Sequence, residues 1–275
     1  MVLPQYDPIL EANFPKFLAA LLDSLVVSLL VTVLIGSVVF WLTPKILKKS
    51  VMDVIGPKEI SPLLKKSATD TRNWAYKGAC GRYMRAKTLP TLARSAKNEG
   101  LSRDIQITIL NPNNDQSCTE YATYRSSLKS AKNSSPWTAI KVKEEVIATI
   151  VSVWRFSNEE PLLQIDLFLA THFSAFRLDI SDHYLIVTKE DNEASALRAD
   201  SGTYFYDSFK DDIKLIQRQS INRKFSNKVP HVKTLTEDVL RNFIIENEII
   251  NREKIIDLNL ETMCRLINLP KDPYS

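Results

Sequence analysis

Histidine and acidic side chains are the residues of this 275-residue chain best suited to catalysis or metal binding. The histidines are His172, His183 and His231, and no two of them stand four residues apart as in a helical metal site. No Cys and His residues have the spacing of a zinc site, and the sequence has no GxSxG nucleophile motif. Asp166 and Asp179 are predicted on neighbouring strands, where we interpret them as strand-edge or solvent-facing acids. We expect no metal site and no cofactor.

One short string has the residue types of a phosphoryl-transfer motif. His231, Lys233 and Asp238 match the pattern HxKxxxxD, which resembles the signature of the phospholipase D superfamily. The resemblance implies that His231 attacks phosphorus to form a covalent phosphohistidine, that Lys233 binds phosphate oxygens and that Asp238 supports the histidine. The family normally needs two copies of the motif, and no Gly-Ser-x-Asn follows this one. We interpret the match as chance, and a membrane-anchored phosphodiesterase or nuclease is the alternative function.

Composition excludes several other classes of protein. Only 6 residues are glycine, and neither GxxxxGK[ST] nor GxGxxG occurs, which argues against a glycine-rich phosphate loop. The chain is 44% hydrophobic and 25% charged, values that exclude intrinsic disorder and a polytopic membrane protein. Cys80, Cys118 and Cys264 are odd in number and form no CxxC, as expected for reduced cytoplasmic thiols.

An apolar run near the N-terminus has the length of a bilayer core. Residues 24–42 are uncharged, and a helix rising about 1.5 Å per residue would cover roughly 28 Å over this run. Extending the run back to Phe17 adds one charge, Asp23. The length of the run and the lack of a preceding basic segment disfavour a signal peptide. We predict an extracytoplasmic segment at 1–16 and a single transmembrane helix at 17–42.

Flanking charges predict how this helix is oriented. Lys45, Lys48 and Lys49 follow the run, whereas the nearest charges before it are Asp7, Glu11 and Lys16. The positive-inside rule therefore places the C-terminal side in the cytoplasm.

Small residues recur at every fourth position of the predicted transmembrane helix. Ser24, Ser28, Thr32 and Gly36 share one helix face, where small side chains let two helix backbones approach closely. We interpret this face as a surface for self-association in the bilayer. The alternative is that the small residues are scattered along an anchor without a partner.

Charge is distributed unevenly although the formal net charge is only +4. Residues 45–103 hold 14 Lys/Arg and 4 Asp/Glu, a local net charge of +10, so the remainder of the chain carries −6. Anionic lipid headgroups attract such a basic region, and nucleic acid is an alternative target of the same field. For any single residue, a solvated face is the simpler interpretation.

Periodicity predicts strands alternating with helices after the membrane segment. Strands are expected at 73–77, 104–110, 162–170, 175–180 and 183–188, the last two joined by a tight turn at 181–182. Helices are expected at 82–97, 115–130, 138–157, 204–219, 234–249 and 252–268, with a kink near Pro90. We predict a basic linker at 43–70, an α/β sandwich domain at 71–220 and a helical C-terminal tail at 221–275.

Three segments of the predicted α/β domain resemble bacterial phospholipase D-like modules. They are TRNWAYKGACGRYMRAKTLPTLARSA, IQITILNPNNDQSCTEYATYRSS and DLFLATHFSAFRLDISDHYLIVTKED. The third is similar to the strand pair that carries the catalytic motif in active members, but here it has Ala175-Phe176-Arg177 in place of His-x-Lys. The resemblance implies a phospholipase D-like α/β sandwich, and the departure argues against hydrolysis.

A short membrane anchor joined to a degenerate module of this kind is similar to the transmembrane effectors of bacterial retron antiphage systems. The resemblance implies abortive infection, in which a phage that disturbs DNA repair releases the effector to damage the inner membrane. It implies an inner-membrane location, with the N-terminus outside and the C-terminal domain in the cytoplasm. The implied partners are the lipid bilayer, further copies of the chain, and a reverse transcriptase with its non-coding RNA or msDNA.

The leading hypothesis is therefore a non-enzymatic membrane effector of antiphage defence. Its soluble module would bind a ribonucleoprotein or nucleotide signal, and its membrane helices would assemble to permeabilise the bilayer. The predicted ligand-binding residues are Arg72, Lys77, Arg82, Arg85 and Arg125.

Overall fold

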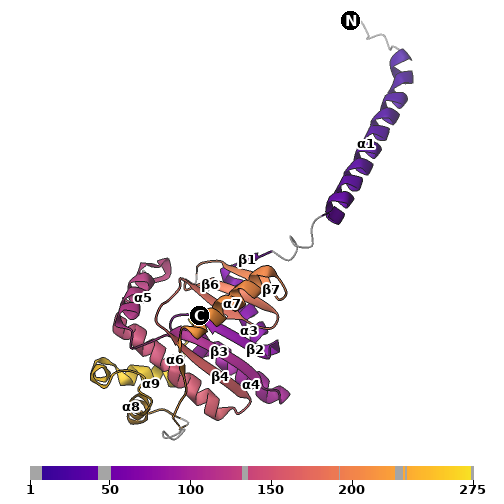
Figure 1. The fold of residues 1–275 in the computed structure, drawn as a ribbon. Helices are drawn as coiled ribbons and strands as arrows, with labels where there is room; N and C mark the ends of the chain where they lie inside the picture. Colours follow the sequence, from indigo (N-terminus) through magenta and orange to yellow (C-terminus); the bar gives the residue numbers. More distant parts are fainter. Residues whose placement is uncertain are drawn as a thin grey trace. The chain divides into compact units, whose positions relative to one another are not determined.

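The structure of the protein is a computed structural model that describes residues 8–42, 51–131, 136–191, 193–226, 232 and 234–273. The chain divides into two compact units, Met1–Lys49 and Ser50–Ser275. The first unit contains one long helix, and the second contains a sheet with helices on its faces (Figure 1).

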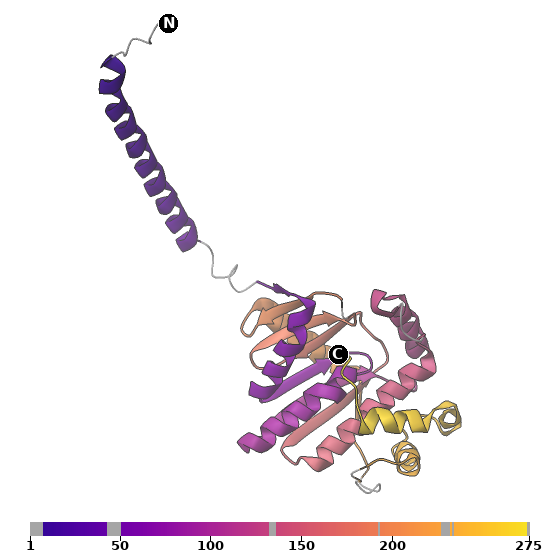
Figure 2. The same cartoon turned by 180° about the vertical axis from the view of Figure 1, so that it is seen from behind.

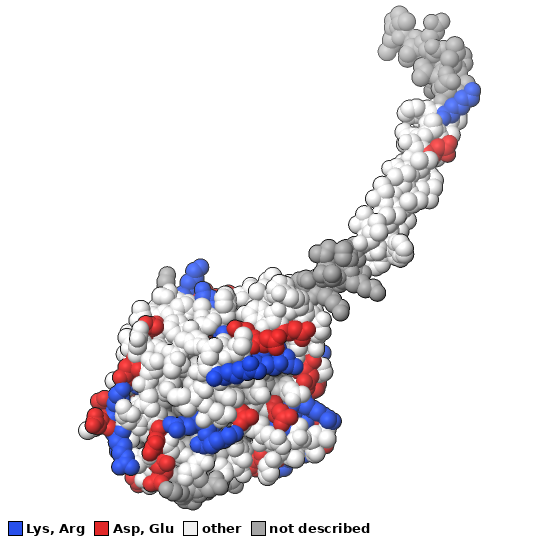
Figure 3. Space-filling model, viewed as in Figure 1, with Lys and Arg blue, Asp and Glu red and all other residues white. Residues whose placement is uncertain are grey.

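The long helix, α1, extends over Pro8–Leu42. From Phe14 onward it is long and apolar enough to cross a membrane, and the side chains of its most apolar stretch are exposed. Figure 3 shows this helix as almost continuous uncharged surface. The expected apolar helix is confirmed, but it begins at Pro8, so the segment predicted at 1–16 is partly helical. Proline suits the first turn of a helix, because an N–H at that position has no helical partner to lose.

The predicted small-residue face lies within α1. The Thr32 hydroxyl donates to the Ser28 carbonyl oxygen at 2.8 Å, so this hydroxyl is satisfied within its own helix. No atom lies within 4 Å of the position that a Cβ on Gly36 would occupy. The face formed by Ser24, Ser28, Thr32 and Gly36 is open to contact, and its self-association stays a prediction.

An eight-stranded mixed sheet forms the centre of the second unit, in the order β1-β7-β6-β5-β2-β3-β4-β8. The strands are β1 Asp53–Ile55, β2 Asn73–Lys77, β3 Arg103–Leu110, β4 Leu163–Ala170, β5 Phe176–Ile180, β6 Tyr184–Lys189, β7 Ala196–Asp200 and β8 Ile221–Arg223. Strands β2, β3 and β4 are parallel to one another, and the other neighbouring pairs are antiparallel. The five predicted strands are confirmed, including the hairpin that joins β5 to β6.

Helices pack on both faces of this sheet (Figures 1 and 2). They are α3 Pro57–Asp70, η1 Met84–Thr88, α4 Leu89–Glu99, α5 Asp115–Ser127, η2 Lys129–Ala131, α6 Ala139–Glu159, α7 Tyr204–Arg218, α8 Glu237–Glu246, η3 Arg252–Asp257 and α9 Leu260–Asn268. A large apolar core joins the sheet to α3, α4, α5, α6, α8 and α9, and a smaller core joins the other face to α7. The predicted α/β sandwich is therefore one sheet between helical layers.

The helix expected at 82–97 contains a change of helix type. Met84–Thr88 is a π-helix, and the Leu89 N–H donates to the carbonyl oxygen of Met84, five residues earlier. The α-helix α4 begins immediately afterwards with Pro90 in its first turn. Since proline has no N–H, the hydrogen-bond register changes where the sequence predicts a kink.

The segment predicted as a linker at 43–70 is instead partly folded. Strand β1 pairs with β7, and α3 buries Ile60, Leu64 and Ala68 in the large core. These three side chains repeat every four residues, which gives α3 an apolar face despite its lysines. The lysines of α3, which are Lys58, Lys65 and Lys66, therefore belong to a packed helix, and Lys45, Lys48 and Lys49 lie outside the described residues.

The tail predicted as separate at 221–275 belongs to the same unit. Strand β8 pairs with β4, and α8 and α9 contribute Leu240, Phe243 and Met263 to the large core. The Phe243 ring lies 4.7 Å from that of Trp154 on α6, measured between centroids. The helix expected at 234–249 is present as the shorter α8, whereas the one expected at 252–268 is divided into the 3-10 helix η3 and the α-helix α9. Their apolar side chains are buried because they would otherwise be exposed to water.

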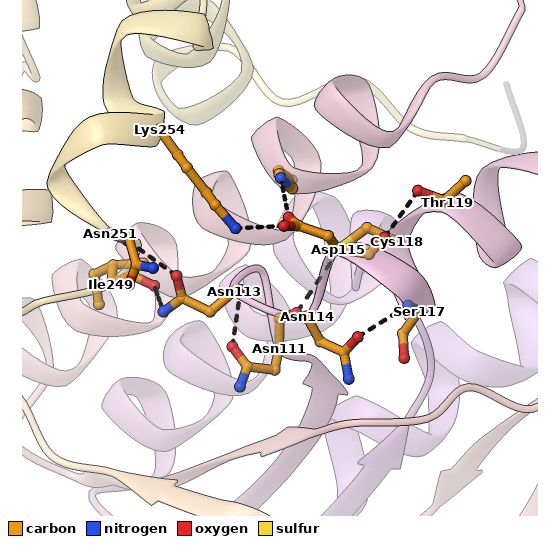
Figure 4. Close-up of polar contacts among 11 residues, drawn as sticks. Asn111, Asn113, Asn114, Asp115, Ser117, Cys118, Thr119, Ile249, Asn251 and Lys254 are labelled. Carbon is orange, nitrogen blue, oxygen red and sulfur yellow. Dashed lines mark hydrogen bonds and ion pairs between the residues drawn. The ribbon is translucent and has the colours of Figure 1, made fainter.

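An asparagine-rich loop joins the tail to the sheet (Figure 4). The side chain of Asn113 donates to the Ile249 carbonyl oxygen at 3.2 Å and accepts from the Asn251 N–H at 3.0 Å. Asp115 pairs with Lys254 of the tail and, at 2.5 Å, with Lys143 of α6. The loop after β3 and the start of α5 therefore contact both the C-terminal tail and α6.

The expectation that Asp166 and Asp179 lie on neighbouring strands is wrong. Asp166 is on β4 and Asp179 on β5, and the sheet order puts β2 and β3 between them. Strands adjacent in the sequence are separated here because β5 pairs with β2 in an antiparallel arrangement.

Candidate functional site

A cavity of about 240 Å³ opens beside the loop that follows β2. Its walls come from that loop and from β2, β5, α5, α6 and the end of β6. Its cationic lining residues are Arg82, Arg125, Lys141 and Arg177, and its acidic lining residues are Glu145, Glu190 and Asp191. Tyr76, Tyr83 and Trp137 add aromatic surface.

Two glycines allow the loop after β2 to pass close to its neighbours. Gly81 has a φ of +68°, and a Cβ there would lie 2.7 Å from Thr149 Cγ2 on α6. A Cβ on Gly78 would collide with the Tyr76 side chain. A side chain at Gly81 would therefore be opposed both by the left-handed backbone and by the contact with α6.

Glu145 holds the arginines on the α6 side of the cavity. Its carboxylate lies 3.5 Å from Arg82 Nε and 2.6 Å from Arg85 Nη2. Arg85 Nη1 also donates to the Glu145 carbonyl oxygen and to the Thr149 hydroxyl, each at 2.9 Å. Arg85 is only 4% exposed and does not line the cavity, and its contacts hold Glu145 in the cavity wall.

A second buried ion pair lies on β5. Arg177 Nε donates to Asp179 Oδ2 at 2.7 Å, and the Arg177 guanidinium lies 5.4 Å from the centroid of the Tyr83 ring. Both members of this pair are buried. Burial raises the pKa of the Asp179 carboxyl, and the charge and hydrogen bond of Arg177 oppose that rise.

Three cations surround the ring of Trp137. Lys141 Nζ is 4.9 Å from the ring centroid, and the guanidinium carbons of Arg82 and Arg125 are each 5.6 Å from it. An indole ring attracts cations through its negative face. The ring therefore helps to hold three positive charges at one side of the cavity without neutralising them.

Helix α5 holds the end of β6 by two side chains one turn apart. The Tyr121 hydroxyl donates to the Glu190 carboxyl, and Arg125 Nη1 donates to the Glu190 carbonyl oxygen. Arg125 Nη1 also lies 3.5 Å from the Ser130 hydroxyl. Among the described residues, no carboxylate forms an ion pair with Arg125, although the charge of Asp191 in the same cavity acts on it.

The environment shifts the ionisation of several lining groups. Burial raises the pKa of Glu190 to about 7, although the Ala79 N–H and the Arg82 charge act in the opposite direction. Burial also lowers the pKa of Arg125, and the nearby Arg82 lowers it further. Burial raises the pKa values of Tyr76 and Cys80 well above their ordinary ranges.

The structure separates the five residues predicted for the ligand face. Arg82 and Arg125 line the cavity, and Arg85 lies buried behind it. Lys77 instead pairs with Asp212 of α7 at 3.3 Å, and Arg72 is exposed at the start of β2. The five residues are separated because they belong to different elements: Lys77 lies on β2, Arg85 on η1 and Arg125 on α5.

The alternative catalytic residues do not form a described site. His231 and Lys233 lie outside the described residues, and Asp238 is exposed in the first turn of α8. His172 and His183 are exposed and do not line the cavity. In the part of the chain that the structure describes, no group of three His, Cys, Asp or Glu residues could hold a metal ion.

Several lining residues were not predicted from the sequence. They are Glu145, Glu190, Trp137, Lys141 and Arg177. Glu145 follows Glu144 within the apolar helix predicted at 138–157, and a carboxylate in such a helix was the available signal. The others have no spacing that would single them out, because the cavity assembles them from separate elements.

No family model matches the chain, and no curated protein matches it. Among solved structures, it is similar to TrmBL2, an archaeal chromatin protein whose structure shows a novel mode of DNA binding. That similarity has 13% identity and a TM-score of 0.37, and covers 78% of this chain and 70% of TrmBL2. The chain is also similar to Nuc of Salmonella typhimurium, a phospholipase D family member. Here the identity is 12% and the TM-score 0.33, covering 63% of this chain and 98% of Nuc.

Proposed function

We propose that this protein is a membrane-anchored, non-enzymatic effector whose cavity binds a phosphate group of a nucleic acid or nucleotide. In this proposal, helix α1 spans the bacterial inner membrane with the folded unit in the cytoplasm. Ligand state at the cavity controls whether the membrane helices assemble and permeabilise the bilayer. The biological setting is antiphage defence of the retron type, with a reverse transcriptase and its RNA or msDNA as partners.

The cationic half of the cavity carries this proposal. Arg125 has no described carboxylate partner, and Arg82 and Lys141 lie beside it around Trp137. Guanidinium groups donate in a planar fork that matches phosphate oxygens, and partial burial strengthens such bonds. The arrangement suits an anion that accepts several hydrogen bonds.

The size of the cavity limits what enters it. At about 240 Å³ it is smaller than the roughly 300–1,000 Å³ of typical small-molecule pockets. It therefore suits one phosphate with part of its sugar or base, while the remainder of the ligand stays outside. The neighbouring Trp137 ring offers a surface on which a base could stack.

The membrane part of the proposal depends on the exposed apolar surface of α1. Exposing the apolar side chains of a helix of this length to water is unfavourable in free energy, and insertion into a bilayer removes this hydration cost. The open face around Gly36 permits close approach of a second copy.

The proposal is tested in cells that carry the full chain with its genomic neighbours and are challenged with phage. Arg125→Gln is expected to abolish protection, whereas Arg94→Gln is expected to retain it, since Arg94 is exposed on α4. Equal protection by both variants, at equal protein levels, would contradict a role for the cavity. His231→Ala is expected to keep full protection, and its loss would favour the phosphodiesterase alternative.

A further inference from the structure

The anion cavity contains an acidic group that opposes an anion. Glu190 directly follows β6, and its carboxyl accepts hydrogen bonds from the Tyr121 hydroxyl and the Ala79 N–H. The carbonyl oxygen of the same residue is held by Arg125. A carboxylate fixed this close to the proposed anion-binding arginine would repel a phosphate.

We infer that the cavity takes up a proton on Glu190 when it binds a phosphodiester, so that Glu190 couples ligand affinity to pH. The inference rests on the proposed function, because it concerns the same cavity and the same ligand. The proton comes from solvent and forms the carboxylic acid. The acid carries no negative charge and gains an O–H donor for a phosphate oxygen.

The charged and titratable groups that surround Glu190 come from several elements of the fold. They are Tyr121 and Arg125 from α5, Cys80 and Arg82 from the loop after β2, Tyr76 from β2, Arg177 from β5, Lys141 and Glu145 from α6, and Asp191 beside it. Tyr76 and Cys80 stay protonated near neutral pH because burial raises their pKa values. Glu145 stays between two arginines.

Glu190 can therefore gain or lose a proton within the physiological pH range. Its pKa of about 7 in the free protein leaves both forms populated near neutrality. An entering phosphate adds negative charge and favours the protonated form. By linkage, a ligand that raises this pKa binds more tightly where Glu190 is already protonated, so affinity falls as the pH rises through 7.

The test measures binding of the oligonucleotide (dT)6 with hydroxyl ends to the full chain in nanodiscs of neutral lipid. This probe contains only phosphodiesters, so its own charge stays constant between pH 6 and pH 8, unlike that of a phosphate monoester. For the wild type, the Kd is expected to rise up to about tenfold over this range, given the pKa of about 7.

Glu190→Gln removes the titrating group and keeps the size of the side chain. This variant is expected to bind with a Kd that changes less than twofold between pH 6 and pH 8, and more tightly than the wild type at pH 8. The matched control is Glu193→Gln at an exposed position nearby, which is expected to keep the wild-type profile. A wild-type pH profile in Glu190→Gln would overturn the inference while leaving the proposed function intact.

Calorimetry on the wild type gives a second measurement that does not depend on how well the variant folds. Binding at pH 8 in two buffers of different ionisation enthalpy is expected to reveal uptake of most of one proton. Binding without proton uptake would overturn the inference. Failure of the probe to bind the folded wild type at any pH would instead overturn the proposed function.

Discussion

Arg85 Nη2 lies 2.6 Å from Glu145 Oε2; both side chains are buried, and of the two only Glu145 lines the cavity. The same arginine donates to the Glu145 carbonyl oxygen and to Thr149, so it joins the π-helical segment η1 to α6. Because Glu145 also contacts Arg82, this pair sets the position of a cation that lines the cavity. Arg85 is therefore a positioning residue.

The first prediction concerns the stability that depends on this pair. Arg85→Met should lower the free energy of unfolding by about 3–5 kcal/mol, because it leaves the Glu145 carboxylate buried without its closest partner. Denaturant unfolding of the full chain in mild detergent measures the change. Arg94→Met, at an exposed position on α4, should change stability by less than about 0.5 kcal/mol. A similar loss in both variants would contradict the role given to the buried pair.

The second prediction compares two glycines with similar backbone conformations. Gly81 and Gly100 have φ values of +68° and +65°, but only Gly81 has a neighbour that a Cβ would strike. Gly100→Ala should cost about 1 kcal/mol through its backbone alone. Gly81→Ala should cost a further about 1–3 kcal/mol through its contact with Thr149. Equal losses, measured by the same unfolding assay, would show that the loop can move away from α6.

The third prediction concerns pH. Burial opposes ionisation of Asp182, but hydrogen bonds from Asn73, Arg72 and Thr71 outweigh it and hold its pKa below the usual range. A lowered folded-state pKa contributes stability above the unfolded value of about 3.9 and loses it as the pH falls through the folded value. Asp182→Asn should therefore be less stable than wild type by about 1–3 kcal/mol at pH 7.

Unfolding midpoints of wild type and Asp182→Asn at pH 7 and at pH 3 test this predicted direction of the pH dependence. The difference between wild type and Asp182→Asn should be largest above about pH 5 and should shrink as the pH falls below about 4. A difference that grows on acidification would contradict the assignment of these hydrogen bonds to the ionised carboxylate.

The elements that the sequence predicts correctly are those with a short-range hydrophobic pattern or turn signal. The alternation in β3, which buries Ile105, Ile107 and Ile109, and the turn at 181–182 are short-range signals, and both predict elements that the structure contains. The pairing of β1 with β7 and the packing of α8 against α6 depend on contacts between distant segments. The basic composition of 43–70 predicts a linker, but α3 in this segment has a buried apolar face beside its lysines.

The candidate site is harder to predict from the sequence, because its residues come from separate elements that the fold brings together. The sequence predicts Arg82 and Arg125 as members of a basic ligand face, and the fold brings both to the ring of Trp137. Arg85 differs from Arg82 by three positions, but the π-helical segment and Glu145 bury it. Glu190 had no sequence signal, since its importance comes from Tyr121 and Arg125 on a distant helix.

The fourth prediction concerns the proposed self-association of α1 in a membrane. Gly36→Leu should prevent dye entry into cells that express the active protein, because a large side chain keeps two helix backbones apart. Val38→Leu is the matched control, since it changes an exposed apolar side chain of the same helix away from the small-residue face. Undiminished dye entry in Gly36→Leu, at equal membrane insertion, would remove the role of this face.

Binding of (dT)6 to wild type and to Arg125→Gln tests the central claim most directly. Both proteins are measured at pH 6.5 as full chains in neutral-lipid nanodiscs, which supply no competing anionic headgroups. Loss of hydrogen bonds between Arg125 and a phosphate should raise the Kd roughly 10- to 100-fold, whereas Arg94→Gln should stay within about twofold of wild type. An unchanged Kd in folded Arg125→Gln would contradict the claim that this cavity binds the phosphate.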